Sequence, residues 1–484
     1  MIIYISIIRK YMKGFSKLMS VKTFDFIIGY ENKVRELESV CLLKYELERR
    51  GYSVFLFQEL DPRYDDVVDI MYHAKVLVVS CGYADNFIES FVRNFITFDK
   101  LVNLQWEQVF NKSLEADPDC LINIHGDLCR QAVQIAWGQE NIKRHTTLAN
   151  IPKENIIKTG LMTMDFLNPK FDKLFKSRQE IQKEYNIDSK YEIAILIGVF
   201  ARAFWTDEQL VKLKEDTGLD LKSEAVTNRQ RFDIEMDWIA RALRENENLF
   251  FIYRPHPGDE YDRCPKDVQK LLDDMVAETG RFIVNQDYTV RQWLKVVDKV
   301  YTGYSTTMVD AFFAKKGCRL LSPAGVDMPD IARLFENATE TNDYETFEAS
   351  LHEETYDSPL NIDMIDAYYT VSDELCYPKV ADACEKVFNT NSYLIDTSDL
   401  RQRMIDASIK KLKGKSFLKR AKLKLWKYDW FYKLYWNFMS LPINNSYFKK
   451  QSDYRNRTDI YCKNYVGSPS EIAEITERIK RCLE

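Results

Sequence analysis

Short apolar runs alternate with amphipathic stretches along the first 160 residues of this chain. The runs lie at 24–29, 52–57, 75–80, 101–104, 120–124 and 156–160. The stretches between them have the spacing of helices, and the first of these, 34–50, ends before Gly51, which predicts a C-cap. Continuous apolar runs joined by helices are typical of buried parallel strands. The pattern therefore predicts an α/β fold with a doubly wound sheet.

A second series of apolar runs follows at 193–198, 249–253, 282–284, 299–302 and 318–321. Lys, Asp, Glu, Gln and Ser dominate residues 168–190 before it, as in a connection between domains. Within the series, Trp-Thr-Asp-Glu at 205–208 has the pattern of a capping box at the start of a helix. We expect one Rossmann-like domain at 23–168, a linker at 169–190 and a second Rossmann-like domain at 191–400.

The two ends of the chain differ from these domains. Residues 2–8 are apolar but far shorter than the ~20 residues of a membrane span, so we expect 1–22 to be an extension or a weak surface anchor. We expect 401–484 to be a basic amphipathic tail, because residues 401–450 hold 14 Lys and Arg residues among many aromatic ones. That mixture suits an anionic membrane surface, and it also suits a helix that packs back onto the N-terminal domain.

Charge and cysteine usage narrow the function classes. The chain has 484 residues and a net charge of −6, whereas nucleic-acid-binding domains are strongly basic. Its ten cysteines are scattered without a Cys-x-x-Cys pair. This indicates reduced thiols in a cytoplasmic protein rather than a disulfide framework or a zinc site. We therefore expect no nucleic-acid partner and no metal.

Two apolar runs of the second series end in polar turns. The first turn carries Arg254 and His256, and the second carries Ser305, Thr306 and Thr307 before an apolar helical pattern. A helix that opens with hydroxyl groups suits a phosphate, and ligands of α/β sheets bind beyond the carboxyl ends of strands. Each motif alone fits an ordinary turn or N-cap. Together they predict a diphosphate site, with the first turn on a neighbouring strand adding positive charge to the same anion.

Arg-Pro-His-Pro at 254–257 and Tyr-Ser-Thr-Thr at 304–307 resemble the C-terminal half of bacterial surface-polysaccharide transferases. The similarity is to CDP-glycerol glycerophosphotransferase-like enzymes and to GT-B sialyl- and Kdo-transferases, over about residues 100–335. Glycerophosphotransferases typically show Thr-Asp-Tyr-Ser-Ser, where this chain has Gly303 in place of the Asp and Thr306 in place of the second Ser. The resemblance implies a GT-B fold in which two Rossmann-like domains face a cleft, with the acceptor in the first and the nucleotide donor in the second. It also implies a metal-independent enzyme that needs no cofactor.

Transfer to an acceptor hydroxyl requires a base, which we expect in the N-terminal domain. Glu107 follows one predicted strand and is the first candidate for the base, although an ordinary solvated surface carboxylate is the simpler interpretation of this residue. Asp127 follows the next strand and is the second candidate, with an N-cap as its alternative role. His125 beside it is a candidate substrate contact. In the C-terminal domain, His256 is a candidate general acid or phosphate donor, and Asp287 more simply caps a helix.

The leading hypothesis is a glycosyltransferase that uses a nucleotide-activated sugar, with a cytidine donor such as a CMP-sugar, to build a bacterial surface polysaccharide. The expected partners are that donor, a glycan or lipid-linked acceptor, and the inner leaflet of the cytoplasmic membrane, where the protein would be peripheral. The alternatives are a CDP-polyol phosphotransferase and a non-catalytic subunit that binds nucleotide sugars. A UDP-sugar epimerase also shares the two-domain fold, but needs acidic and His residues that are sparse in the sequence.

Overall fold

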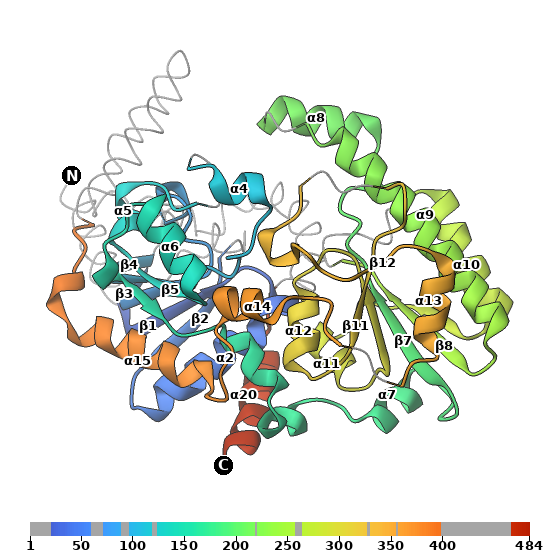
Figure 1. The fold of residues 1–484 in the computed structure, drawn as a ribbon. Coiled ribbons are helices and arrows are strands. Elements are labelled where there is room, and N and C mark those ends of the chain that lie inside the picture. The colour runs from blue at the N-terminus through green and yellow to red at the C-terminus, as the bar shows by residue number, and fades with distance from the viewer. Residues whose placement is uncertain are drawn as a thin grey trace, which may run out of the picture. The chain divides into compact units, whose positions relative to one another are not determined.

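The computed structural model describes residues 21–59, 71–88, 96–118, 123–217, 220–256, 264–326, 330–354, 357–397 and 466–484. Contacts divide the chain into two compact units (Figure 1). Unit 1 consists of Met1–Gln108, Asp117–Met162 and Glu374–Glu477, and unit 2 of Val109–Ala116, Thr163–Asp373 and Arg478–Glu484, each as far as it is described.

Unit 1 contains a parallel six-stranded sheet with the order β2-β1-β3-β4-β5-β6. The strands are β1 (Val21–Tyr30), β2 (Val54–Gln58), β3 (Met71–Val79), β4 (Ile96–Asn103), β5 (Val133–Ala136) and β6 (Ile156–Lys158). The chain leaves β1 for β2 on one side and reaches β3 on the other side. The topology therefore reverses between β1 and β3, as it does in doubly wound sheets.

One strand of unit 1 was missed by the apolar pattern. The run at 120–124 predicts a strand; residues 123 and 124 belong to none, and residues 120–122 lie outside the described part. The described sheet contains β5, which pairs with β4 and with β6. Its four residues are all buried, yet Gln134 interrupts the apolar pattern; its side chain bonds to Asn103 at 2.8 Å.

Helices cover the sheet of unit 1, and some of them come from distant parts of the sequence. The helices are α2 (Lys33–Arg49), α5 (Asp127–Gln131), α6 (Gln139–Thr147), α15 (Cys376–Asn389) and the first part of α20 (Pro469–Leu483), with single turns at η2 (Lys153–Asn155) and η7 (Asn391–Tyr393). Helix α2 ends as predicted, because Gly51 follows it with a φ of 94°.

Helix α15 packs on α2, β3 and β4. Arg50 at the end of α2 reaches Asp382 at 2.7 Å and Glu385 at 2.9 Å. The contacts thus place α15 in unit 1, whereas the predicted second domain extended to residue 400. The start of α20 also lies on unit 1, where Lys33 pairs with Glu471 at 3.1 Å. The basic stretch at 401–450 lies outside the described residues.

Unit 2 contains a second parallel six-stranded sheet, with the order β12-β11-β10-β7-β8-β9. The strands are β7 (Glu192–Ile197), β8 (Leu249–Arg254), β9 (Phe282–Val284), β10 (Lys299–Thr302), β11 (Cys318–Leu321) and β12 (Glu340–Thr341). The five predicted apolar runs correspond to β7 through β11. The chain builds β8 and β9 on one side of β7 and then crosses to β10 on the other side.

The predicted linker at 169–190 packs within unit 2, where Arg178 bonds to Asp298 at 2.7 Å. The helices of this unit are α4 (Lys112–Ala116), η3 (Met162–Leu167, from residue 163 on), η4 (Pro169–Leu174), α7 (Arg178–Glu184), α8 (Asp207–Thr217), α9 (Lys222–Glu245), α10 (Lys266–Thr279), α11 (Val290–Leu294), α12 (Thr307–Phe313), η6 (Arg333–Phe335), α13 (Tyr344–Leu351), α14 (Ile362–Tyr369) and the end of α20. The capping box before α8 is confirmed, since Thr206 and Gln209 exchange bonds of 2.7 and 3.3 Å between backbone and side chain.

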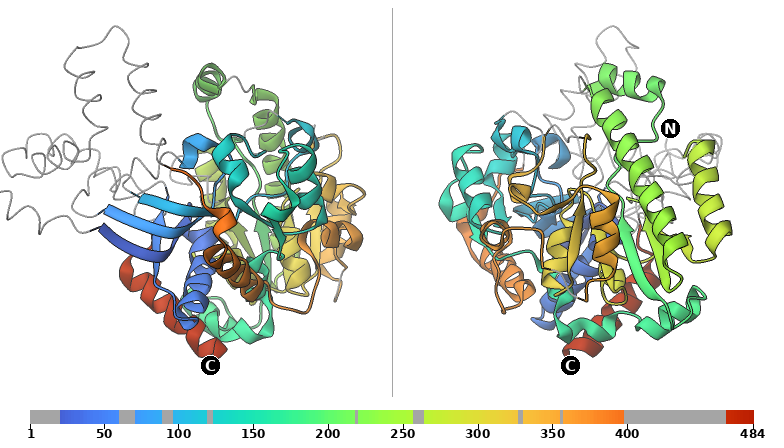
Figure 2. Two further views of the ribbon diagram at one scale, coloured as in Figure 1. Left: turned by 90° about the vertical axis from the view of Figure 1, so that its left-hand side faces the viewer. Right: turned by 45° about the vertical axis from the view of Figure 1, so that its right-hand side comes forward.

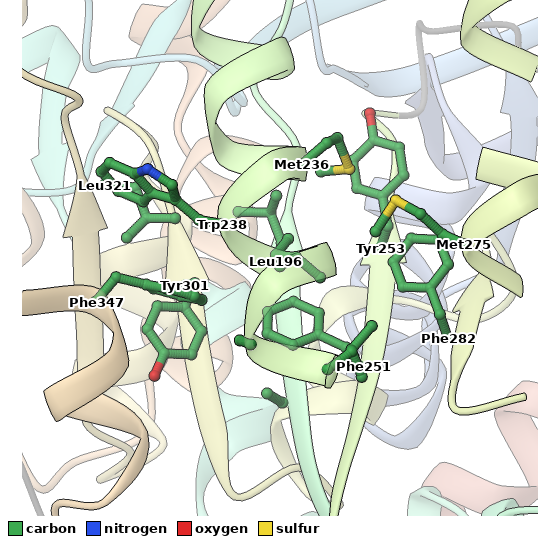
Figure 3. Close-up of a cluster of buried hydrophobic side chains, with 14 of the residues drawn as sticks. Leu196, Met236, Trp238, Phe251, Tyr253, Met275, Phe282, Tyr301, Leu321 and Phe347 are labelled. Atoms are coloured by element: carbon green, nitrogen blue, oxygen red, sulfur yellow. The ribbon is translucent and has the colours of Figure 1, made fainter. Parts of the chain in front are cut away.

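Helices α9 and α10 lie along one face of this sheet, where they build its apolar core (Figure 2). Alternate residues of the strands, including Leu196, Tyr253 and Tyr301, point toward this face because side chains in a strand alternate in direction. They meet Met236 of α9 and Phe347 of α13 in one buried cluster (Figure 3). The packing holds the carboxyl ends of the strands in fixed order.

The expected α/β class is confirmed: the chain has two units, each with a parallel six-stranded sheet and flanking helices. Among the helices that the structure describes, none has the length and apolar character to cross a membrane.

Candidate active site at the carboxyl edge of unit 2

The two predicted turns lie at the same edge of the sheet of unit 2. Because the strands are parallel, the turn after β8 and the turn after β10 both leave the carboxyl edge. The sequence predicted that these two strands are neighbours, but they are not. Each of them pairs with β7, which lies between them. The turns are therefore about 10 Å apart across the sheet, two strand spacings. The topology reverses between β7 and β10, the position at which α/β sheets bind ligands.

The turn after β10 presents its hydroxyl groups unequally. The hydroxyl of Ser305 is engaged within the turn, since its Oγ accepts from the N–H of Thr307 at 3.2 Å and donates to Thr307 Oγ1 at 3.1 Å. Thr307 is buried, whereas Thr306 is exposed and makes no side-chain cap bond. The N–H groups of Met308 and Val309 already donate to carbonyls of the turn. Thr306 is thus the most accessible of the three predicted hydroxyls.

Arg254 and His256 leave the end of β8 in different surroundings. Arg254 is buried, and its Nη1 donates to the carbonyl of Asp287 at 2.8 Å, while Nη2 donates to the carbonyl of Tyr288. Burial lowers the pKa of this guanidinium to about 10. The side chain thereby braces the loop after β9. His256 is exposed, and its backbone carbonyl accepts from Gln286 at 3.1 Å.

Asp287 does not cap helix α11, contrary to the prediction. Its Oδ2 accepts from the hydroxyl of Tyr185 at 3.0 Å. The cap is Thr289, whose hydroxyl accepts from the N–H of Gln292. The loop that contains Asp287 is therefore tied to α7 on one side and to Arg254 on the other.

The structure adds a buried ion pair that the sequence did not single out. Arg231 and Glu235 lie one turn apart on α9 and pair at 3.1 Å, with side chains 1% and 0% exposed. Pairs at this spacing are common on exposed helix faces, so the sequence contained no signal of burial. Arg231 extends to Gly303, where a Cβ would overlap its guanidinium.

In unit 1, Glu107 lies in the loop after β4. Its side chain is 46% exposed, and it pairs with Arg35 at 2.7 Å. Arg35 also contacts Glu31 at 3.2 Å and Glu36 at 2.8 Å. The fold therefore gathers several glutamates around one arginine at the carboxyl edge of this sheet. In the sequence, acidic residues that could serve a site in this unit appeared sparse.

Asp127 is almost fully exposed and lies 3.8 Å from Arg130. It does not act as an N-cap: Asp85 caps α5 from another part of the chain, because its Oδ1 accepts from the N–H groups of Leu128 and Cys129. A Cβ at Gly126 would overlap this carboxylate. His125 precedes Gly126 and is half-buried. Its backbone N–H donates to the carbonyl of Tyr83 at 2.6 Å.

Glu59 is a second residue that sequence reasoning missed. It follows β2, is 4% exposed, and accepts from the N–H of Ser80 at 2.7 Å. Burial raises the pKa of its carboxyl to about 8. Its proximity to Gly29, where a Cβ would overlap the carboxylate, places it beneath the end of β1. The described residues contain no group of three His, Cys, Asp or Glu side chains arranged to hold a metal ion.

No protein-family model and no curated protein matches this chain. Solved structures with a similar fold include S. aureus MnaA with UDP (12% identity, covering 76% of this chain and 97% of that one, TM-score 0.47). They also include the wall teichoic acid polymerase TagF (13%, 77% and 90%, 0.45) and a putative UDP-N-acetylglucosamine 2-epimerase from Listeria monocytogenes (10%, 77% and 97%, 0.44). Similarity at this level says nothing about the reaction, which depends on the site itself.

Proposed function

We propose that the protein is a glycosyltransferase that binds a nucleotide-activated sugar at the carboxyl edge of unit 2 and builds a bacterial surface polysaccharide. The observation that carries the proposal is the arrangement around β7: the Gly303–Thr307 turn follows the strand on one side of it, and the turn with His256 follows the strand on the other. This is the topological position for a ligand, and the turn residues are types that bind phosphate.

The roles proposed for the residues follow from their exposure. His256 and Thr306 are exposed at the edge, so they would contact the phosphates directly, and His256 would protonate the leaving group or donate a hydrogen bond to it. Ser305 and Thr307 would act mainly by shaping the turn. Arg254, which is buried, would add positive charge to the site while its guanidinium holds the loop after β9.

The base that deprotonates the acceptor belongs, in this proposal, to unit 1. Glu107 remains the first candidate because its carboxylate is accessible and Arg35 holds it in place. Asp127 is exposed and needs no role as a cap, so it remains the second candidate. His125 beside it would contact the acceptor.

Nucleotide preference tests the donor. Thermal-shift titrations with CMP, CDP, UDP and GDP should raise the melting temperature, because a ligand that binds only the folded state stabilises it. A cytidine donor predicts the largest shift with CMP or CDP. A larger shift with UDP or GDP would replace the cytidine assignment, and no shift with any of the four would remove the nucleotide-sugar proposal.

His256→Ala tests the site. We expect a loss of about 10²-fold or more in kcat/KM, the scale for an electrostatic stabiliser, with an unchanged melting temperature. His352→Ala is the matched control, because His352 is also exposed in unit 2 but pairs with Glu348 on α13. Full activity of the His256 variant would refute the assignment.

A UDP-sugar epimerase is a second candidate, favoured by the glutamates gathered around Arg35 in unit 1. Incubation with a UDP-sugar separates the two functions. An epimerase converts the free nucleotide sugar without any acceptor, whereas a transferase releases the nucleotide only when an acceptor is present. A CDP-polyol phosphotransferase is less favoured, because Gly303 replaces the aspartate of that family.

We place the protein on the inner face of the cytoplasmic membrane, where a lipid-linked acceptor would be available. The composition of residues 401–450 supports this location, since 14 cations lie among aromatic residues. Co-sedimentation with phosphatidylglycerol vesicles at low and high salt is the direct test.

A further inference from the structure

Trp205 is the single exposed aromatic side chain among the residues that the structure describes, with 42% of its surface accessible. The other described tryptophans are buried, namely Trp106, Trp137, Trp238 and Trp293. An indole ring loses a large apolar area to a ligand that covers it, and its N–H remains available as a donor. The exposed ring is therefore a candidate binding surface.

The loop that carries Trp205 begins at the proposed donor site. It follows β7, the strand that lies between the two turns proposed to bind phosphate. The start of the loop contacts the second of these turns, since a Cβ at Gly303 would lie 2.5 Å from Cγ2 of Val199. The loop and the Gly303–Thr307 turn thus lie side by side at the carboxyl edge of unit 2.

The loop is compact, so Trp205 stays near that edge. The N–H of Ala203 donates to the carbonyl of Phe200 at 3.0 Å, and the N–H of Trp205 donates to the carbonyl of Arg202 at 3.0 Å. Bonds of this spacing give tight turns that rise about 2 Å per residue, so the five residues from Phe200 to Trp205 span about 10 Å. A ligand that extends beyond the donor phosphates can reach the ring.

The backbone of Arg202 fixes the direction in which the ring is presented. Its φ of 61° lies in the left-handed region, which is uncommon for residues other than glycine and persists where the surroundings hold it. Helix α9 provides these surroundings. Asn228 donates to the carbonyl of Ala201 at 3.0 Å, and Glu224 pairs with the guanidinium of Arg202 at 3.0 Å. The guanidinium carbon also lies 5.9 Å from the centroid of the Trp205 ring.

The charges near Trp205 compensate each other. Arg202 pairs with Glu224, and Lys222 at the start of α9 pairs with Asp207 at the start of α8, also at 3.0 Å. An anion such as phosphate binds most strongly to a cation that it can neutralise, whereas sugar hydroxyls can both donate to a carboxylate and accept from a guanidinium. The C–H face of a sugar ring can in turn pack on an indole. This surface therefore suits an uncharged ring with hydroxyl groups better than an anion.

We propose that Trp205, Arg202 and Glu224 form a platform that binds a sugar ring of the acceptor glycan next to the donor site. The proposal rests on the proposed function, because it assumes that the turns bind the donor and that the acceptor is a glycan. Helix α8 and the start of α9 extend from this point past the carboxyl edge of the sheet, along which a polymer could lie (Figure 1). The platform holds the chain of the acceptor and takes no part in the chemical step.

The test uses two uncharged tetrasaccharides, chitotetraose and maltotetraose, as probes. Saturation-transfer NMR detects contact with the sugar C–H groups, and titration gives the Kd. We expect wild type to bind at least one of them, and Trp205→Ala to raise its Kd about tenfold or more, because the apolar contact with the ring is lost. Trp205→Phe should retain most of the affinity, and the melting temperature of both variants should stay unchanged because the side chain is exposed. Val211→Ala, an exposed change on α8, is the control.

A second pair of variants tests the polar part of the platform. Arg202→Met removes the guanidinium beside the ring and should raise the Kd of the tetrasaccharide severalfold. Arg229→Met is its matched control, since Arg229 pairs with Asp233 at 3.0 Å on another part of α9. Equal effects of the two substitutions would contradict a role for Arg202 in the platform.

Nucleotide binding separates this proposal from the proposed function. The Kd of CDP and UDP should be the same for Trp205→Ala and wild type. A loss of nucleotide affinity in that variant would mean that the indole stacks on the base of the donor, and would overturn the acceptor role. A wild type that binds nucleotides but neither tetrasaccharide would overturn the platform and leave the proposed function intact. Binding of a tetrasaccharide without any nucleotide would refute the donor site and leave the sugar platform.

Discussion

Glu59 makes a prediction about stability that can be calculated from its burial. The carboxyl is 4% exposed beneath the end of β1, and burial raises its pKa from the ordinary value of 4.5 to about 8. The folded state therefore keeps a proton that the unfolded state releases between pH 4.5 and about 8. Because the unfolded state binds fewer protons in this window, stability falls as the pH rises.

The size of the effect follows from the shift. One pKa unit corresponds to about 1.4 kcal/mol, so Glu59 lowers the free energy of unfolding by about 3 kcal/mol at pH 7 relative to pH 4.5. Glu59→Gln mimics the protonated carboxyl, because the amide oxygen can still accept from the N–H of Ser80. We expect the variant to match wild type near pH 4.5 and to exceed its stability increasingly up to pH 8.

Melting temperatures of both proteins at several pH values between 4.5 and 8.5 measure the difference. Glu48→Gln, an exposed charge change on α2 of the same unit, is the control. Melting curves of Glu59→Gln and wild type that stay parallel across this range would refute the reasoning, because they would mean that Glu59 is ionised in the folded protein.

Three other predictions follow from the same features. Arg254→Lys should lower both turnover and melting temperature, since one ammonium cannot donate to the carbonyls of Asp287 and Tyr288 in the planar geometry of a guanidinium; kinetics and stability equal to wild type would contradict this. Turnover should persist in excess EDTA, and a loss that Mg²⁺ or Mn²⁺ restores would show that a metal takes part. Replacing the Lys and Arg residues of 401–450 by Gln should release the protein from anionic vesicles; this is cleaner than deletion after residue 400, which would also remove α20 and its contact with Lys33. A full-length protein that ignores vesicles at low salt would refute membrane contact.

The strands of unit 2 show how much the sequence alone can predict. The predicted runs at 282–284, 299–302 and 318–321 coincide with β9, β10 and β11, because strands that are buried on both faces consist of continuous apolar residues. The same rule failed at β5, where a buried glutamine interrupts the pattern and finds its partner on β4. A polar residue in a strand is predictable only when its hydrogen-bond partner is known.

The sequence by itself determined the two series of strands, the alternation with helices, and the presence of two polar turns at strand ends, because each depends on residues that are close along the chain. Tertiary structure decided which strands are neighbours, and so placed β7 between the two turns. It also decided that Asp85, not Asp127, caps α5, and that α15 packs on unit 1. Arg231 is the clearest case: its spacing from Glu235 fits an exposed helix face, and only the packing of α9 against the sheet buries the pair beneath Gly303. Burial and charge compensation depend on residues brought together from distant parts of the chain, which local pattern does not contain.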